Sequence, residues 1–178
     1  MIWSIIFIVV LLALDRASKI LLASYLANKS LVTLIPGFFG LYLLDGGNTG
    51  AAWGILSGMP LLLAAISIVA MIFLIYLLFV RRPHSRILKI AMILIIAGGL
   101  GNLYDRIVYG AVTDFFVFLF IDFPIFNVAD CCITVGAILA MVYMIVSKKD
   151  DPMFVVEFKK RGPIKRDSKD AARKKGKK

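Results

Sequence analysis

The chain has 178 residues, of which 61% are hydrophobic, and its 21 Lys and Arg against 11 Asp and Glu give a formal net charge of +10. A soluble domain of this length does not carry so many apolar residues, so the composition excludes the soluble class and indicates one integral membrane domain. We expect no separate soluble catalytic domain.

Four apolar runs are long enough, or nearly so, to cross about 30 Å of hydrocarbon at about 1.5 Å per residue. They extend from Ile2 to about Leu26, from about Pro60 to Val80, from about Ile87 to Leu103, and from about Asn127 to Ser147. The first run has no basic segment before it and no small-residue cleavage site after it, so we expect a retained span. The predicted fold is all-α, with four transmembrane helices in residues 1–149.

The segment between the first two runs has a strand pattern. Leu31–Ile35 and Phe38–Leu44 are short, apolar and partly β-branched or aromatic, and Pro36-Gly37 separates them. Such a pattern predicts two short strands joined by a turn, lying on the membrane surface.

Basic residues set the expected orientation. The link between the second and third runs contains Arg81, Arg82, Arg86 and Lys89, and most other basic residues follow the fourth run. With four spans these two regions share one side, which the positive-inside rule makes cytoplasmic. Both termini are then cytoplasmic, and residues 27–59 and 104–126 face outward.

Residues 150–178 are rich in Lys and Arg and have little apolar periodicity. They predict a disordered cytoplasmic tail that is attracted to anionic lipid headgroups. A nucleic-acid-binding tail is the alternative. It is disfavoured because no aromatic residues for base stacking alternate with the charges near the terminus, so we expect no nucleic-acid partner.

The cysteines indicate no redox or metal chemistry. Cys131 and Cys132 are adjacent, which rarely satisfies disulfide geometry, and His84 is the only histidine. We expect both cysteines to be small core residues, no metal or other cofactor, and no Cys–His or Ser–His–Asp catalysis.

Most polar residues of the apolar runs fall near one depth, the outer interface. Asp15 and Lys19 lie in the first run, Asn127 and Asp130 lie at the start of the fourth, and Asn48 lies in the outer segment. Asn102, Asp105 and Arg106, together with Gly98, share one face near the end of the third run if its helix continues. Scattered structural polar groups would have no reason to share a depth.

Each of these residues also has a structural interpretation. Asp15 and Lys19 could be a structural ion pair that helps to join helices, and Asn102 and Asn127 could make interhelical hydrogen bonds. Arg106 could extend its side chain to the interface or pair with the preceding Asp105. The glycines at 98, 99 and 101 are typical of close helix packing, and Asp122 of a solvated loop.

Asp114 and Asp130 are the least easily explained in this way. A carboxylate at membrane depth costs about 3 kcal/mol on insertion scales. Two carboxylates at close range disfavour double ionisation and so hold one proton between them. One can then take a proton from water while its protonated partner polarises an amide carbonyl, which is the chemistry of an aspartic protease.

Four segments resemble the motifs of the bacterial lipoprotein signal peptidases (signal peptidase II). They are Asp15-Arg16-Ala17-Ser18-Lys19, Asn48-Thr49-Gly50-Ala51-Ala52, Gly101–Arg106 with the following Gly110-x-Val112-x-Asp114, and Phe126-Asn127-Val128-Ala129-Asp130. They occur in the family's order over roughly Met1–Ser147. Any one motif is weak, but the set is specific.

The resemblance implies an aspartic endopeptidase of the bacterial plasma membrane with Asp114 and Asp130 as its catalytic pair and its active site near the extracytoplasmic face. It implies a diacylglyceryl prolipoprotein substrate, cleaved N-terminal to the lipidated lipobox cysteine, inhibition by globomycin and a small β-cradle in the first outer segment. The implied substrate-binding or supporting residues are Asp15, Lys19, Asn48, Gly50, Asn102, Arg106, Asn127 and Ala129.

Other functions fit the residues less well. Gly99–Asn102 comes near the Gly-x-Gly-Asp motif of prepilin peptidases but has Asn where Asp is needed. Ser18 and Lys19 are adjacent on a helix and make a poor catalytic dyad. A proton relay through Asp15, Lys19 and Asp130 should have polar groups throughout the membrane depth. A non-catalytic scaffold would tolerate loss of both aspartates.

Overall fold

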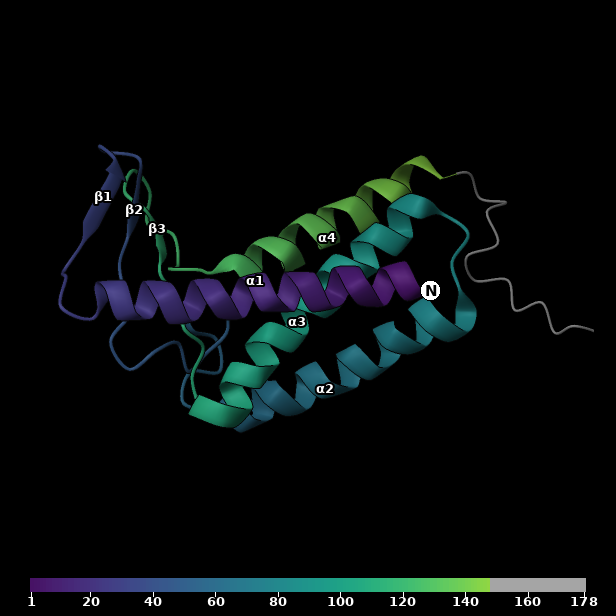
Figure 1. Ribbon diagram of the computed structural model, residues 1–178, viewed down its shortest axis with the longest axis horizontal. Coiled ribbons are helices and arrows are strands. Elements are labelled where there is room, and N and C mark those ends of the chain that lie inside the picture. The colour runs from purple at the N-terminus through teal and green to yellow at the C-terminus, as the bar shows by residue number, and fades with distance from the viewer. Residues whose placement is uncertain (148–178) are drawn as a thin grey trace, which may run out of the picture. The chain divides into compact units, whose positions relative to one another are not determined.

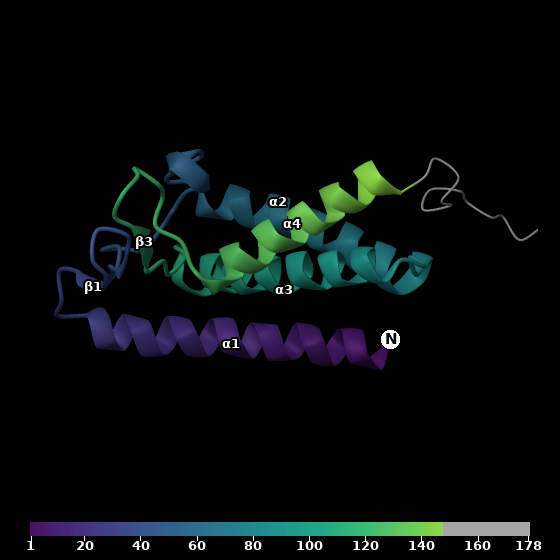
Figure 2. The same cartoon turned by 90° about the horizontal axis from the view of Figure 1, so that it is seen from above.

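The computed structural model describes residues 1–147, in which four long helices lie beside one another with a small sheet at one end (Figures 1 and 2). The helices are α1 (Ile2–Leu26), α2 (Pro60–Tyr76), α3 (Arg86–Tyr109) and α4 (Val128–Val146), and a π-helical turn, η2 (Leu77–Arg81), continues α2. The strands are β1 (Val32–Ile35), β2 (Phe39–Leu41) and β3 (Phe116–Phe118), and a 3₁₀ turn, η1 (Ala52–Gly54), precedes α2. The predicted tail, residues 150–178, lies outside the described residues.

Three of the described helices are long and apolar enough to cross a membrane. They are Pro60–Arg81, Arg86–Tyr109 and Val128–Val146. The 25-residue α1 is also long, but it contains Asp15, Arg16 and Lys19. The molecule is therefore a mostly helical, multi-pass membrane protein.

Helices occur at the four predicted positions, and one of them is longer than predicted. The third continues to Tyr109 instead of ending near Leu103. Its last turns therefore place Asn102, Asp105 and Arg106 on one continuous helix, which the predicted polar face required.

Helix α3 is the central helix of the bundle, because it packs against each of the other three long helices. Three of its glycines face three different neighbours: Gly98 faces the Ala129 carbonyl of α4, Gly99 faces Met71 of α2, and Gly101 faces the Asp15 carboxylate of α1. A Cβ at any of these positions would collide with the facing atom. The expectation that these glycines permit close helix packing is confirmed.

The predicted hairpin is confirmed, and a third strand completes the sheet. β1 pairs antiparallel with β2, with Gly37 in the turn at a φ of 66° that favours glycine. The unpredicted β3 pairs antiparallel with β2, with Phe118 opposite Phe39. The sheet therefore connects the segment between α1 and α2 to the chain between α3 and α4.

Adding a methyl group at Gly98 should destabilise the bundle more than adding one at Gly99. The Gly98→Ala methyl meets backbone of α4 and should cost about 1–3 kcal/mol in the free energy of unfolding. The Gly99→Ala methyl meets only the flexible end of Met71, and a helix-propensity gain of about 1 kcal/mol offsets that clash. The free energy of unfolding of both variants is measured in detergent micelles. Equal losses of stability would contradict the contacts of α3 with α4 and α2 described above.

Candidate active site

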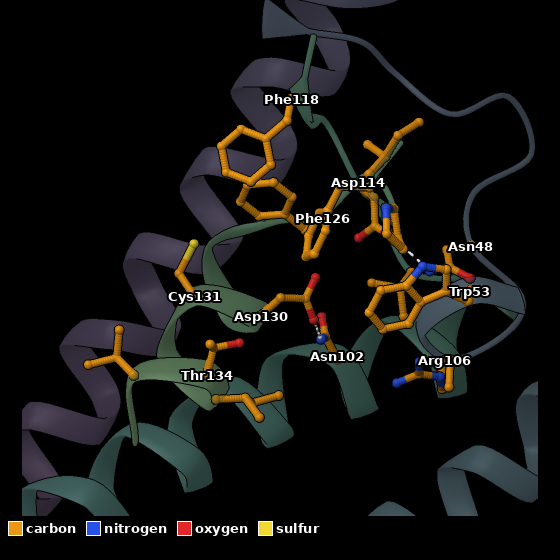
Figure 3. A pocket seen from close by; sticks show the side chains of 17 residues that line it. Asn48, Trp53, Asn102, Arg106, Asp114, Phe118, Phe126, Asp130, Cys131 and Thr134 are labelled. Atoms are coloured by element: carbon orange, nitrogen blue, oxygen red, sulfur yellow. Dashed lines mark hydrogen bonds between the residues drawn. The ribbon is translucent and has the colours of Figure 1, made fainter. Parts of the chain in front are cut away.

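Asp114 and Asp130 line one cavity of about 530 Å³ at the sheet end of the helices (Figure 3). Asp114 lies in the segment between α3 and β3, and Asp130 lies in the first turn of α4. Folding therefore brings the two carboxyl groups, which the sequence separates, to a shared space.

Backbone hydrogen bonds hold the segment of Asp114 on both sides. Before it, Asn48 and Val112 exchange backbone bonds of 2.8 and 2.9 Å. After it, Phe116 and Phe126 exchange backbone bonds of 2.8 and 3.0 Å. The carboxyl of Asp114 is thus placed by strand-like pairing, although only three residues of the segment form a regular strand.

Asp130 is placed by the start of its own helix. Its backbone N–H donates to Asn127 Oδ1 at 3.0 Å, and its Oδ2 accepts the backbone N–H of Asn127 at 3.0 Å. This reciprocal capping box satisfies two N–H groups that a helix start leaves free. The positive end of the helix dipole also favours a negative charge there.

Three asparagine side chains donate to the two carboxyl groups. Asn48 Nδ2 donates to Asp114 Oδ2 at 2.9 Å, and Asn127 Nδ2 donates to Asp114 Oδ1 at 2.6 Å. Asn102 Nδ2 donates to Asp130 Oδ1 at 2.7 Å. Together with the capping box, these bonds give every carboxyl oxygen of the pair a donor.

Fixed donors determine which way two of these amides face. Asn48 Oδ1 accepts the backbone N–H of Gly50 at 2.9 Å, and Asn127 Oδ1 accepts that of Asp130. Because an amide has one accepting end and one donating end, each NH₂ group must then point toward Asp114.

A buried ionic cluster joins α1 to α3 and α4 beside the cavity. Lys19 Nζ lies 2.9 Å from Asp15 Oδ2 and 2.9 Å from Asp105 Oδ2, and Arg16 also pairs with Asp105. Asp15 Oδ1 accepts the backbone N–H of Ala129 at 3.1 Å. Asp15 and Lys19 thus form the expected ion pair, but sequence reasoning did not identify Asp105 as their shared partner.

Arg106 faces the cavity and not Asp105. Its Nη2 donates to the carbonyl of Gly50 at 3.0 Å, and its side chain lines the cavity. Successive helix residues point about 100° apart, so Asp105 faces α1 when Arg106 faces the cavity. The alternative of an Arg106–Asp105 pair is therefore wrong.

Four aromatic side chains are among the residues that line the rest of the cavity, and sequence reasoning missed them. Phe118 and Phe126 have ring centroids 5.2 Å apart, and Trp53 meets Phe123 edge-on at 5.8 Å. The run of phenylalanines between positions 115 and 126 was the available signal. The walls are therefore apolar and the polar groups gather at the two aspartates.

The expectation that both cysteines lie in the core is wrong. Cys131 is exposed and lines the cavity, and Cys132 is partly exposed. Both follow Asp130 on the first turns of α4, where only part of the helix faces the bundle. Asp122 is exposed, as expected for a solvated loop residue.

The electrostatics of the pair favour one shared proton. Burial, and after it the negative charge of Asp130, raises the pKa of Asp114 to about 6. The hydrogen bonds from Asn48 and Asn127 act in the opposite direction. A protonated carboxyl beside an ionised one can hold and deprotonate a water molecule, as acid–base hydrolysis requires.

The chain is similar to known membrane peptidases over most of its length. Residues 7–146 match the family described as signal peptidase (SPase) II. The lipoprotein signal peptidase of Clostridium acetobutylicum is 39% identical over 140 residues, covering 77% of this chain and 88% of that protein. That of Enterococcus faecalis is 36% identical over 139 residues, covering 78% and 85%.

Two solved structures have a similar fold. One is a bacterial membrane enzyme determined by the in meso method at 2.3 Å resolution, with a TM-score of 0.74 and 34% identity, covering 82% of this chain and 88% of that one. The other, at 1.9 Å, has a TM-score of 0.73 and 33% identity, covering 83% and 96%.

Asp114 should exchange a proton near pH 6. Below that pH its carboxyl is neutral, and above it the group ionises against the charge of Asp130. Infrared spectra recorded between pH 4 and 8 should show a protonated carboxyl band that disappears through about pH 6 and is missing from Asp114→Asn. A band that survives in that variant would assign the titration to another residue.

Proposed function

The chain belongs to the signal peptidase II family, and we propose that Asp114 and Asp130 are the catalytic pair of this enzyme. It is a membrane-bound aspartic peptidase that removes signal peptides from prolipoproteins. The observation that carries the proposal is the position of both carboxyl groups in one cavity, with a hydrogen-bond donor on every oxygen.

Asp130 acts as the base and Asp114 carries the proton in this proposal. Asp130 lies at the positive end of α4, where a carboxylate is favoured, and Arg106 adds a nearby positive charge. Because its pKa is raised, a larger fraction of Asp114 than of an exposed carboxyl is protonated near neutral pH, and this protonated form can donate to the scissile carbonyl. Water loses a proton to Asp130 as it attacks the amide carbon, and Asp114 hydrogen-bonds the carbonyl oxygen. Asp130 then gives that proton to the nitrogen as the C–N bond breaks, which leaves a new carboxyl terminus on the signal peptide and a free amino group on the lipoprotein.

The supporting residues have two proposed tasks. Asn48, Asn102 and Asn127 hold the carboxyl groups, while Arg106 and the backbone of Gly50 shape the side of the cavity that receives the substrate chain. Asp15, Lys19 and Ala129 link α1 to the start of α4. The apolar walls fit a lipidated substrate, cleaved N-terminal to its diacylglyceryl cysteine.

We also propose the membrane arrangement. All four long helices span the bacterial plasma membrane, with both termini in the cytoplasm and the cavity near the outer face. In support, the basic link between α2 and α3 lies at the opposite end of the helices from the sheet (Figure 1). A signal peptide inserts with its basic end inside, which brings its cleavage site to the outer face.

Conversion of either aspartate to asparagine should abolish cleavage. We expect Asp114→Asn and Asp130→Asn to lower kcat by about 10³-fold or more, because an amide replaces the acid or the base. The assay follows the gel shift of a synthetic diacylglyceryl prolipoprotein in detergent, with and without globomycin, which should block the wild-type enzyme.

Asp122→Asn is the matched control, since this exposed carboxylate lies in the same outer segment. It should cleave at the wild-type rate. Cleavage that survives in a folded Asp114→Asn or Asp130→Asn enzyme would remove that residue from the mechanism.

A further inference from the structure

No residue of α1 is among the described residues that line the cavity, yet two successive hydrogen bonds connect Lys19 of α1 to Asp130. Lys19 Nζ donates to Asn102 Oδ1 at 2.9 Å, and Asn102 Nδ2 donates to Asp130 Oδ1 at 2.7 Å. Lys19 is only 1% exposed, so substrate in the cavity does not touch it.

We infer that Lys19 is a positioning residue, whose ammonium group turns the Asn102 amide so that its NH₂ group faces Asp130. This inference rests on the proposed function of Asp130. It gives α1 a role in the reaction that differs from joining helices.

The ammonium group permits only one orientation of the amide. Lys19 has three N–H donors and no acceptor, and it meets three oxygens, one each from Asp15, Asp105 and Asn102. A reversed Asn102 amide would place its NH₂ group against the ammonium group and its oxygen against the carboxylate of Asp130. Both contacts would be repulsive.

Without Lys19, one weaker donor to the Asn102 oxygen remains among the described residues. Asn127 Nδ2 donates to Asn102 Oδ1 at 3.1 Å, but the same group donates to Asp114 at 2.6 Å. Lys19 is therefore the donor that acts on the Asn102 oxygen most directly. Its loss should leave the amide less firmly oriented and should weaken the hydrogen bond from Asn102 to Asp130.

A purely structural role is the competing account, since Lys19 also neutralises two buried carboxylates. When Lys19 is removed, Asp105 keeps Arg16 and the backbone N–H of Thr113, but Asp15 keeps only the backbone N–H of Ala129 on Oδ1, and its Oδ2 loses its cation. We therefore expect Lys19→Met to be less stable than wild type, and its folding is checked before kcat is measured. The double variant Lys19→Met with Asp15→Asn removes one charge of each sign, and it replaces the single variant in the cycle if that variant does not fold.

The experiment is a double-mutant cycle between Lys19 and Asn102, read in the cleavage assay. Lys19→Met should lower kcat by about 100-fold, as expected for loss of one preorganised hydrogen bond, with KM within about threefold of wild type. When Lys19→Met is added to Asn102→Ala, kcat should fall by less than about threefold relative to Asn102→Ala alone, because the amide through which Lys19 acts is absent.

Arg16→Gln is the matched control. Arg16 is a cation on the same helix that pairs with the same Asp105, but Asn102 is not among its partners. Its removal should leave kcat within about threefold of wild type. The inference would be overturned if Lys19→Met lowered kcat by the same factor in the wild-type and Asn102→Ala backgrounds. It would also be overturned if Arg16→Gln lowered kcat as much as Lys19→Met does.

These outcomes are separate from the test of the proposed function. If Asp114→Asn or Asp130→Asn still cleaves, the catalytic pair is wrong whatever the Lys19 variants do. If both aspartate variants are inactive and the cycle is additive, only the role of Lys19 is wrong.

Discussion

The structure depends on holding two carboxyl groups inside an apolar membrane domain. Desolvation disfavours their ionised form, and an unpartnered carboxylate there would be costly. Each oxygen of Asp114 and Asp130 accepts a hydrogen bond, and the donating amides are themselves fixed by other donors. The groups that hold the pair come from α1, α3, α4 and the segment between α1 and α2, so the site exists only when all of these are assembled.

The bundle and the site share the same contacts. Gly98 lets α3 approach the start of α4, and Gly101 admits the Asp15 carboxylate between α1 and α3. That carboxylate also accepts the N–H of Ala129 in the turn that carries Asp130. Close helix packing and the placement of Asp130 therefore depend on the same contacts, and a change that separates α3 from α4 should disturb both.

Much of this arrangement could be predicted from the sequence, because hydrophobic length, helical spacing and basic links are local signals. The helices, the first hairpin, the face that carries Asn102 and the Asp15–Lys19 pair follow from such signals. The third strand did not, because Phe116–Phe118 is short and pairs with a strand far away in the sequence. The partners of Asp105 and the exposure of Cys131 depend on how neighbouring helices are rotated, which spacing alone does not determine.

The central claim is that amide N–H groups hold the carboxyl pair, and Asn127→Ser tests it most directly. Serine is as good an N-cap as asparagine, so the start of α4 should keep its stability. The substitution removes the Nδ2 group that donates to Asp114 and adds no charge. We predict a folded enzyme that no longer cleaves a diacylglyceryl prolipoprotein at neutral pH. Cleavage at the wild-type rate would contradict the account.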